Sequence, residues 1–263
     1  MVAAGVEGKA PKEPDTDPLR PRGKDGGMQQ QRLASLRTPP IGFAHRGARA
    51  HADDNTLPSF SLALSLGATG LETDVVRTKD GVAVLDHDGR IRGRLRSIPI
   101  ATLSRTELPP HIPSIDDLYE TCGTAYELSV DAKDPDAIAP LVAAARRHDA
   151  EARLWICHPD LDLLSGWRDR TSARLVCSTR LTSLKEGPER RAALLSDRGI
   201  DAINMHHSDW SGGLTTLFHR FGRFCLAWDA QHERVIGDLV RMGIDGIFCD
   251  HVDRLMTSIN TDS

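Results

Sequence analysis

Two histidines stand where short apolar runs of the chain end, and both could carry out acid/base chemistry. His45 closes the apolar run that begins at Ile41, and His87 follows a run that ends at Leu85. An imidazole titrates near pH 6.5, so either side chain could accept or donate a proton at neutral pH. We therefore treat His45 and His87 as the candidate catalytic residues.

Three carboxylates at similar positions predict a metal site. Glu72 and Asp74 lie two residues apart in the run 70–75, so in a strand both project from the same face. Buried carboxylates repel each other unless something neutralises them, and oxygen ligands favour a hard divalent cation, Mg²⁺ or Ca²⁺. Asp131, at the end of the run 125–131, is the expected third ligand. Pairing of these carboxylates with arginines at the rim of the fold is the alternative.

Two cations accompany these groups and suggest an anionic substrate. Arg46 follows His45 directly, and Lys133 lies two residues after Asp131. Cations, a metal and two histidines that converge on one pocket describe a site for a phosphate ester, because positive charges hold the anion while histidines move protons. Glu127 lies roughly 13 Å below Asp131 along the same strand. We expect Glu127 to form a salt bridge or to face outward at the other end.

The elements that must position these residues form a repeated strand–helix alternation. Strands are expected at 41–45, 70–75, 125–131, 153–157, 173–178, 201–205, 224–228 and 245–249. Apolar spacing predicts helices at 56–66, 135–148 and 233–242 and one that begins at Ser114. Apolar strands that alternate with helices imply a parallel sheet covered on both faces. Eight units predict an α/β protein, a single-domain (β/α)8 TIM barrel, with a doubly wound open sheet as the alternative. Both folds bind ligands at the carboxyl ends of the strands.

The start of the chain differs from the rest. Residues 1–38 are rich in Pro, Gly and Gln and poor in large apolar side chains, which predicts a disordered N-terminal tail before a barrel over residues 39–260. This segment lacks the apolar core of a secretory signal peptide. Either Met1 or Met28 could be the natural start.

Composition limits the possible binding partners and indicates the cellular compartment. The 263 residues carry 33 Lys+Arg and 37 Asp+Glu, a formal charge of −4 without a basic stripe, so nucleic-acid binding is not expected. No run approaches the ~20 apolar residues of a transmembrane segment. Five cysteines without a CxxC pair predict buried thiols in a reducing compartment, and therefore a cytoplasmic protein. The oligomeric state is left open.

The ordered motifs along residues 45–88 resemble the glycerophosphodiester phosphodiesterase family. They are His45-Arg46-Gly47-Ala48, Asp54-Asn55-Thr56, Leu71-Glu72-Thr73-Asp74-Val75, Thr78-x-Asp80-Gly81 and His87-Asp88. The run 243–250 is similar to the last strand of that family, and Trp228 to its tryptophan on the seventh strand. The resemblance implies a (β/α)8 barrel in which Glu72 and Asp74 bind a divalent cation, His45 and His87 form the acid/base pair, and Arg46 contacts the phosphate.

The resemblance also implies a reaction. A hydroxyl of the glycerol attacks phosphorus, the alcohol leaves, and water opens the cyclic phosphate, so that a small-molecule diester yields glycerol 3-phosphate and an alcohol. Such a hydrolase would serve glycerol and lipid metabolism. We expect Lys133 and Trp228 to contact the substrate.

Two departures from the family pattern concern residues at or near the expected site. Asp54-Asn55-Thr56 replaces the usual Glu-Asn-Thr, which fits a role at a helix start or behind the metal ligands. Asp131-Ala132-Lys133 stands where Glu-x-Lys is common, a form similar to the related sphingomyelinase D branch. Two alternatives therefore remain: a lysophospholipase D or sphingomyelinase-D-like activity on phospholipids, and a non-catalytic barrel that binds a phosphorylated ligand.

Overall fold

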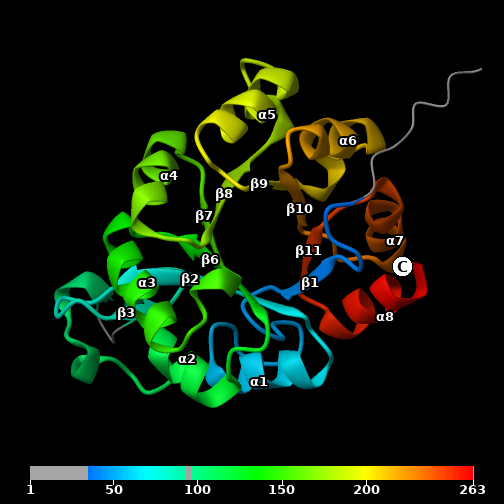
Figure 1. Cartoon of the computed structure of the whole chain (residues 1–263). Coiled ribbons are helices and arrows are strands. Elements are labelled where there is room, and N and C mark those ends of the chain that lie inside the picture. The colour runs from blue at the N-terminus through cyan, green and yellow to red at the C-terminus, as the bar shows by residue number, and fades with distance from the viewer. Residues whose placement is uncertain (1–34, 93–95, 263) are drawn as a thin grey trace, which may run out of the picture. The chain divides into compact units, whose positions relative to one another are not determined.

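The computed structural model describes residues 35–92 and 96–262, and in this part of the chain eight parallel strands close into a barrel (Figure 1). They are β1 Ile41–Ala44, β2 Gly70–Arg77, β6 Glu127–Ala132, β7 Leu154–His158, β8 Arg174–Thr179, β9 Ala202–His206, β10 Phe224–Trp228 and β11 Gly246–Cys249. Each pairs in parallel with its neighbours in chain order, and β1 pairs with both β2 and β11. This closure confirms the predicted (β/α)8 barrel and excludes an open sheet.

Helices form the outer ring in Figure 1. They are α1 Leu57–Ser65, α2 Ile115–Cys122, α3 Ile138–Arg147, α4 Leu161–Trp167, α5 Pro188–Asp197, α6 Gly212–Arg220, α7 Glu233–Met242 and α8 Val252–Asp262. The side chain of Thr56 caps α1, and Ser114 with Asp117 forms a capping box at α2, so polar caps mark the starts that the sequence predicts. Within the described ranges, no helix combines the length and the apolar character needed to cross a bilayer.

The described residues form three short strands beyond the eight that we predicted, and one of them pairs with the barrel. β3 (Ala83–Leu85) pairs antiparallel with β2, while β4 (Arg90–Arg92) and β5 (Ser97–Pro99) pair with each other. The backbone amide of Asp86 donates to the carbonyl of Asp74 at 3.2 Å. The chain after β3 is therefore held beside the carboxyl end of β2, where His87 follows.

The barrel interior is apolar in its middle and polar at both ends. Its buried apolar cluster consists of Ile41, Phe43, Trp155, Cys157, Val176, Ala202, Leu226 and Phe248. At the amino end of the strands, Glu127 accepts hydrogen bonds from Trp155 Nε1 at 2.8 Å, Arg37 Nη1 at 3.2 Å and Arg174 Nη1 at 3.4 Å. Glu127 thus forms the predicted salt bridge, at the end of the barrel opposite to Asp131.

The predicted disordered tail over residues 1–38 lies outside the described residues as far as residue 34. The last residues of that range contact the barrel. Ser35 Oγ donates to Asp245 Oδ1 at 2.7 Å, and the Arg37 backbone amide donates to the same oxygen at 3.0 Å. Residues 35–38, which we expected in the tail, therefore pack on the amino end of the barrel.

Gly70 on β2 gives a test of the packing inside the barrel. A Cβ at this position would lie 2.5 Å from Phe43 Cδ1 and 2.8 Å from Ile41 Cγ2. Because both contacts belong to packed core side chains, we expect Gly70→Ala to lower the free energy of unfolding by about 1–3 kcal/mol, as measured by urea denaturation. Gly166→Ala is the matched control, since its Cβ would meet nothing within 4 Å. An equal loss in both variants would contradict the packing argument.

Candidate active site

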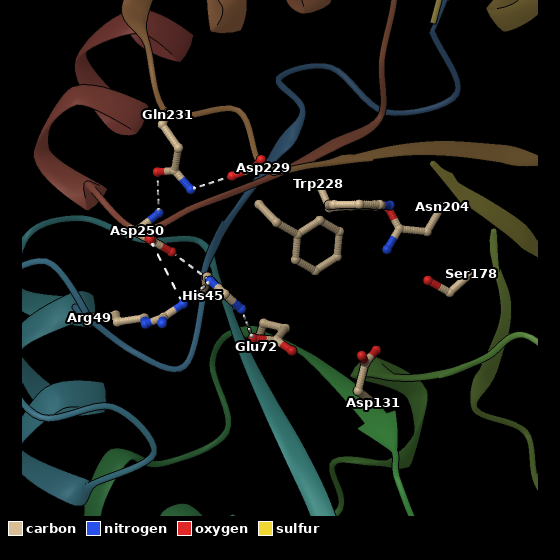
Figure 2. A pocket seen from close by; sticks show the side chains of 11 residues that line it. His45, Arg49, Glu72, Asp131, Ser178, Asn204, Trp228, Asp229, Gln231 and Asp250 are labelled. Carbon is tan, nitrogen blue, oxygen red and sulfur yellow. Dashed lines mark hydrogen bonds and ion pairs between the residues drawn. The ribbon is translucent and has the colours of Figure 1, made fainter. Parts of the chain in front are cut away.

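A cavity of about 380 Å³ opens at the carboxyl ends of the barrel strands (Figure 2). Four of the predicted site residues line it: His45, Glu72, Asp131 and Trp228. They come from four different strands, β1, β2, β6 and β10, or from the residue that follows one. The barrel closure thus brings together side chains that lie as much as 183 positions apart in the sequence, from 45 to 228.

His45 is held at the wall of this cavity by two acidic side chains. Its Nδ1 lies 2.6 Å from Asp250 Oδ1, and its Nε2 lies 3.8 Å from Glu72 Oε2, as Figure 2 shows. Burial by itself lowers the pKa of His45, but the hydrogen bond to Asp250 and the nearby negative charges outweigh it, so the net pKa is raised. An imidazole with its Nδ1 proton on a carboxylate leaves Nε2 free to accept a second proton.

Asp250, the partner of His45, was missed in the sequence analysis. It directly follows β11, so the same pattern that identified His45, an ionisable residue at the end of an apolar run, could have found it. Its backbone amide donates to Gln231 Oε1 at 3.0 Å. Burial by itself raises the pKa of Asp250, but the hydrogen bond and charge of His45 outweigh it and hold the carboxyl below its usual range.

This pairing predicts the response of His45 to a change at Asp250. Asp250→Asn removes the negative charge and keeps the shape, so we expect the pKa of His45 to fall. Asp229→Asn is the matched control, because Asp229 lines the same cavity and contacts His206 and Gln231 instead. The pKa is measured by NMR titration of the imidazole. An unchanged value in Asp250→Asn would show that Asp250 does not tune His45.

The three predicted metal ligands come together through the pairing of β2 with β6. Asp74 is the direct register partner of Asp131, and Glu72 lies two residues before Asp74 on the same face. One carboxylate oxygen of each lies within 4.8 Å of the other two. Burial raises the pKa of Glu72 to about 8, with the charges of Asp74 and Asp131 adding to the effect, and burial also raises the pKa of Asp131. Three crowded carboxylates, two of them buried, fit a hard divalent cation, which would neutralise them.

The predicted phosphate contacts, Arg46 and Lys133, point to the carboxylates. Arg46 Nε lies 3.1 Å from Asp74 Oδ2, and Lys133 Nζ lies 3.2 Å from Asp74 Oδ1 and 3.3 Å from Asp131 Oδ2. The pairing with arginine that we considered as an alternative is therefore present beside the carboxylate cluster. Neither cation is among the described residues that line the main cavity, although Lys133 lines an adjoining hollow.

Arg49 is a cation that lines the cavity, and the sequence analysis missed it. It lies in the loop after β1, and its side chain is 40% exposed. Its Nη1 is 3.5 Å from His45 Nδ1. Because Arg49 stands in a loop, four residues past His45, a search of strand ends could not identify it.

The loop after β1 has a backbone that only certain residues adopt readily. Arg46, Gly47 and Asn55 all have positive φ angles, of 53°, 84° and 55°. The Arg46 amide donates to Glu72 Oε2 at 2.9 Å, and a Cβ at Gly47 would lie 2.5 Å from Ser59 Oγ. Asn55 Nδ2 donates to Asp74 Oδ2 at 3.3 Å. The His-Arg-Gly and Asp-Asn-Thr motifs therefore orient two of the expected metal ligands, which supports the role behind the ligands that we expected for the second motif.

His87 is placed apart from His45. Its side chain is 42% exposed, its Nδ1 lies 2.8 Å from Asp88 Oδ1, and it is not among the described residues that line the cavity. It stands two residues after β3, beside the end of β2 that carries Asp74. The structure therefore places His87 on the rim, and its role as the second catalytic histidine stays a prediction.

The cavity wall opposite His45 contains the ring of Trp228 and the polar side chain of Asn204. Trp228 ends β10, and its ring meets that of His206 edge-on at 4.6 Å between centroids. Asn204, missed in the sequence analysis, lines the cavity, and its buried Oδ1 has no hydrogen-bond partner among the described residues. An asparagine inside an apolar run has no distinctive pattern, so only the fold identifies it. This wall could bind the part of a ligand that lies away from His45.

Comparison with known proteins finds relatives that are named glycerophosphodiester phosphodiesterases. Residues 45–111 match the model of the glycerophosphoryl diester phosphodiesterase family. A Mycobacterium tuberculosis protein named "Probable glycerophosphodiester phosphodiesterase 2" is 28% identical over 242 residues, covering 82% of this chain and 89% of that protein. A glycerophosphodiester phosphodiesterase of Caldanaerobacter subterraneus is 25% identical over 250 residues, covering 82% of this chain and 96% of that protein.

Solved structures share the fold. A glycerophosphodiester phosphodiesterase of Thermotoga maritima superposes with a TM-score of 0.72 at 20% identity, covering 83% of this chain and 97% of that one. An Oleispira antarctica phosphodiesterase, solved with the product sn-glycerol 3-phosphate, superposes with a TM-score of 0.72 at 21% identity, covering 84% and 97%. At this identity the likeness shows the barrel, and the family-model match over residues 45–111 contains His45, Glu72, Asp74 and His87.

Proposed function

Because the chain belongs to the glycerophosphodiester phosphodiesterase family, we propose that it hydrolyses glycerophosphodiesters to glycerol 3-phosphate and an alcohol, with a divalent cation and a histidine acid/base pair. One observation carries the proposal. A single cavity joins His45, oriented by Asp250, to the carboxylates Glu72 and Asp131, and the buried Asp74 has a carboxylate oxygen within 4.8 Å of theirs. This combination supports both proton transfer and metal binding beside one substrate.

In the proposed reaction His45 acts as the base. Asp250 holds the Nδ1 side of the ring, so Nε2 takes the proton from the glycerol hydroxyl next to the phosphate. The oxygen of that hydroxyl forms a bond to phosphorus as the bond from phosphorus to the alcohol oxygen breaks. His87, on the rim, donates a proton to the departing alcohol. Water then opens the cyclic phosphate, and the two histidines reverse their roles.

The remaining residues bind and orient. Glu72, Asp74 and Asp131 would hold Mg²⁺ or Ca²⁺, which when bound would neutralise charge on the phosphoryl oxygens and lower the pKa of a bound hydroxyl. Arg46 and Lys133 both pair with the Asp74 carboxylate, and in this proposal each contacts a phosphate oxygen. Arg49 contacts the phosphate from the cavity wall. Trp228 packs against the glycerol or the alcohol. The catalytic roles and these contacts are proposals for this chain.

A substrate panel tests the proposal. We expect glycerol 3-phosphate to be released from glycerophosphocholine or a similar diester, the rate to fall to background in EDTA, and Mg²⁺ or Ca²⁺ to restore it. A coupled assay for glycerol 3-phosphate provides the measurement. Hydrolysis that continues unchanged in EDTA would show that the carboxylate assignment is wrong.

The size of the cavity bears on the lipid alternative. At about 380 Å³ it suits a small diester, and a lysophospholipid would have to leave its acyl chain outside. We therefore expect glycerophosphocholine to be hydrolysed faster than lysophosphatidylcholine. A faster reaction with the lysophospholipid would favour the lysophospholipase D or sphingomyelinase-D-like activity. Binding of glycerol 3-phosphate without any turnover would favour a non-catalytic barrel.

We also propose a cytoplasmic location. All five cysteines are free thiols, and four of them are buried. Reduced cysteines in this number are typical of a reducing compartment. With these substrates and products, the enzyme would serve glycerol and lipid metabolism.

A further inference from the structure

Two histidines and one aspartate form a second group at the carboxyl end of the barrel, outside the cavity. His51 belongs to the loop after β1, His251 stands between β11 and α8, and Asp253 lies in the first turn of α8. One imidazole nitrogen or carboxylate oxygen of each lies within 4.8 Å of the other two. We propose that these three side chains, here called the rim site, bind a transition-metal ion of the Zn²⁺ type.

The side chains of the rim site already face one another. His51 Nε2 lies 3.2 Å from Asp253 Oδ1, and the rings of His51 and His251 are 6.2 Å apart between centroids at an angle of 82°. The side chains of His51 and Asp253 are 39% and 52% exposed. A hydrated ion can therefore reach the group, and water can complete a tetrahedral shell around three protein ligands.

The backbone holds these ligands in place before any metal arrives. The Ala50 amide donates to the carbonyl of Asp250 at 3.3 Å, which ties the loop after β1 to the chain after β11. The His51 amide donates to the carbonyl of Ala48 at 2.8 Å, and the carbonyl of His251 accepts from the Leu255 amide at 3.0 Å. Because both segments are fixed, little conformational entropy is lost when the ligands bind an ion.

The ligand types distinguish the rim site from the carboxylate cluster in the cavity. Two imidazoles with one carboxylate suit Zn²⁺, Cu²⁺ or Ni²⁺, whereas three carboxylates suit Mg²⁺ or Ca²⁺. Asp253 supplies the carboxylate of this set, with Oδ1 at 3.2 Å from His51 Nε2. The two sites can therefore hold different metals at the same time.

The rim site lies where the barrel closes, so a bound ion would affect the stability of the fold. β1 and β11 are the first and last strands, and they pair with each other where the barrel closes. In Figure 1 the helix α8 stands between α7 and α1 in the outer ring. An ion bound to His51, His251 and Asp253 would cross-link the two ends of the barrel across this closure, and would stabilise the folded state by mass action.

The test uses Zn²⁺ alone as the probe on the full chain, with excess Mg²⁺ present to occupy the carboxylate cluster. We expect one bound zinc per chain in a chelator-competition titration. We also expect the Tm to rise by about 5–10 °C at a zinc concentration about a hundred times Kd. Both effects should be lost in His51→Asn and His251→Asn. His148→Asn is the matched control, because His148 also pairs with one aspartate, Asp116, at 3.0 Å but belongs to no three-ligand group among the described residues.

The proposal is overturned if His51→Asn and His251→Asn bind zinc with the wild-type stoichiometry and Kd. It is also overturned if His148→Asn abolishes zinc binding to the same extent as His51→Asn and His251→Asn. Should a histidine variant fold poorly, Asp253→Asn provides the second measurement. Co²⁺ bound through imidazole gives visible absorption bands, and we expect Asp253→Asn to change them. Bands identical to those of the wild type would place the cobalt elsewhere and overturn the proposal.

Discussion

Replacing His45 by alanine is expected to lower kcat on glycerophosphodiesters about 10²–10⁴-fold, because the reaction then loses the group that takes the proton from the attacking hydroxyl. His45 is the imidazole whose Nδ1 is held by Asp250 at 2.6 Å while its Nε2 faces the cavity. The fold should survive, since the side chain is 28% exposed and belongs to no apolar cluster. Steady-state kinetics and the Tm measure the two effects separately.

Chemical rescue separates a proton-transfer role from a structural one. Free imidazole should partly restore the activity of His45→Ala, because it can enter the vacated space and accept the proton. His158→Ala is the matched control: His158 ends β7, yet it bonds to the Asp160 amide at 3.0 Å and does not line the main cavity. We expect this variant to keep nearly the wild-type rate. Wild-type turnover by His45→Ala would refute the mechanism.

The leaving group tests the role of His87. If His87 protonates the departing alcohol, His87→Ala should lose most of its activity on glycerophosphocholine but little on glycerophospho-p-nitrophenol, whose leaving group needs no proton. His45→Ala should be slow on both substrates. An equal loss by His87→Ala on both would exclude the acid role, in agreement with the exposed position of this side chain on the rim.

Glu72→Gln carries the second large expected effect, on metal binding. The substitution keeps the size of the side chain and removes its charge from the cluster with Asp74 and Asp131. Groups that merely support a metal ligand typically contribute 10–100-fold in affinity, so loss of a ligand charge should raise the Kd for Mg²⁺ or Ca²⁺ at least about 100-fold. Calorimetric titration measures the Kd. Glu127→Gln, at the opposite end of the barrel interior, is the control and should bind the metal normally.

The same variant should have the opposite effect on the stability of the metal-free protein. The carboxyl of Glu72 titrates near pH 4.5 in an unfolded chain and near pH 8 when folded, because burial disfavours its charged form. The folded state therefore binds more protons between these values, and the free energy of unfolding of the wild type falls as the pH rises from about 4.5 to about 8. Because glutamine does not titrate, Glu72→Gln avoids this loss of stability.

We therefore expect metal-free Glu72→Gln to be more stable than the wild type at pH 8, and the order to reverse when Mg²⁺ or Ca²⁺ is added. Thermal unfolding in EDTA and in excess metal, at pH 5 and pH 8, makes the comparison. If the variant is less stable than the wild type in EDTA at pH 8, the ionised carboxylate stabilises the fold and the argument from burial is wrong.

Local patterns in the sequence predict most of the barrel. The apolar runs match the eight strands to within about two residues at each end, because a period-two or continuous apolar pattern is a property of neighbouring residues. Ser114 with Asp117 marks the start of α2 for the same reason, since a helix cap is made within four residues. β3 corresponds to the apolar run that ends at Leu85, whereas β4 and β5 were not predicted, because three-residue strands are too short to show a period.

Much of the candidate site can also be predicted from residues that are close in the sequence. Glu72 and Asp74 share a face of β2 because side chains alternate along a strand, and no tertiary information is needed to see it. Asp131 could be chosen over Glu127 from its place at the carboxyl end of the same strand. His45 was found because it interrupts an apolar run at a strand end.

The tertiary structure alone decided which of these groups meet. The bond from His45 to Asp250 joins residues 205 positions apart, and it exists because β1 pairs with β11 when the barrel closes. The register of β2 against β6 sets Asp74 beside Asp131, and the turn after β1 directs Arg46 to Asp74. Strand register and barrel closure depend on contacts between distant segments. The sequence therefore determines which chemical groups stand at the strand ends, and the closed barrel determines their partners, their charges and the cavity that they share.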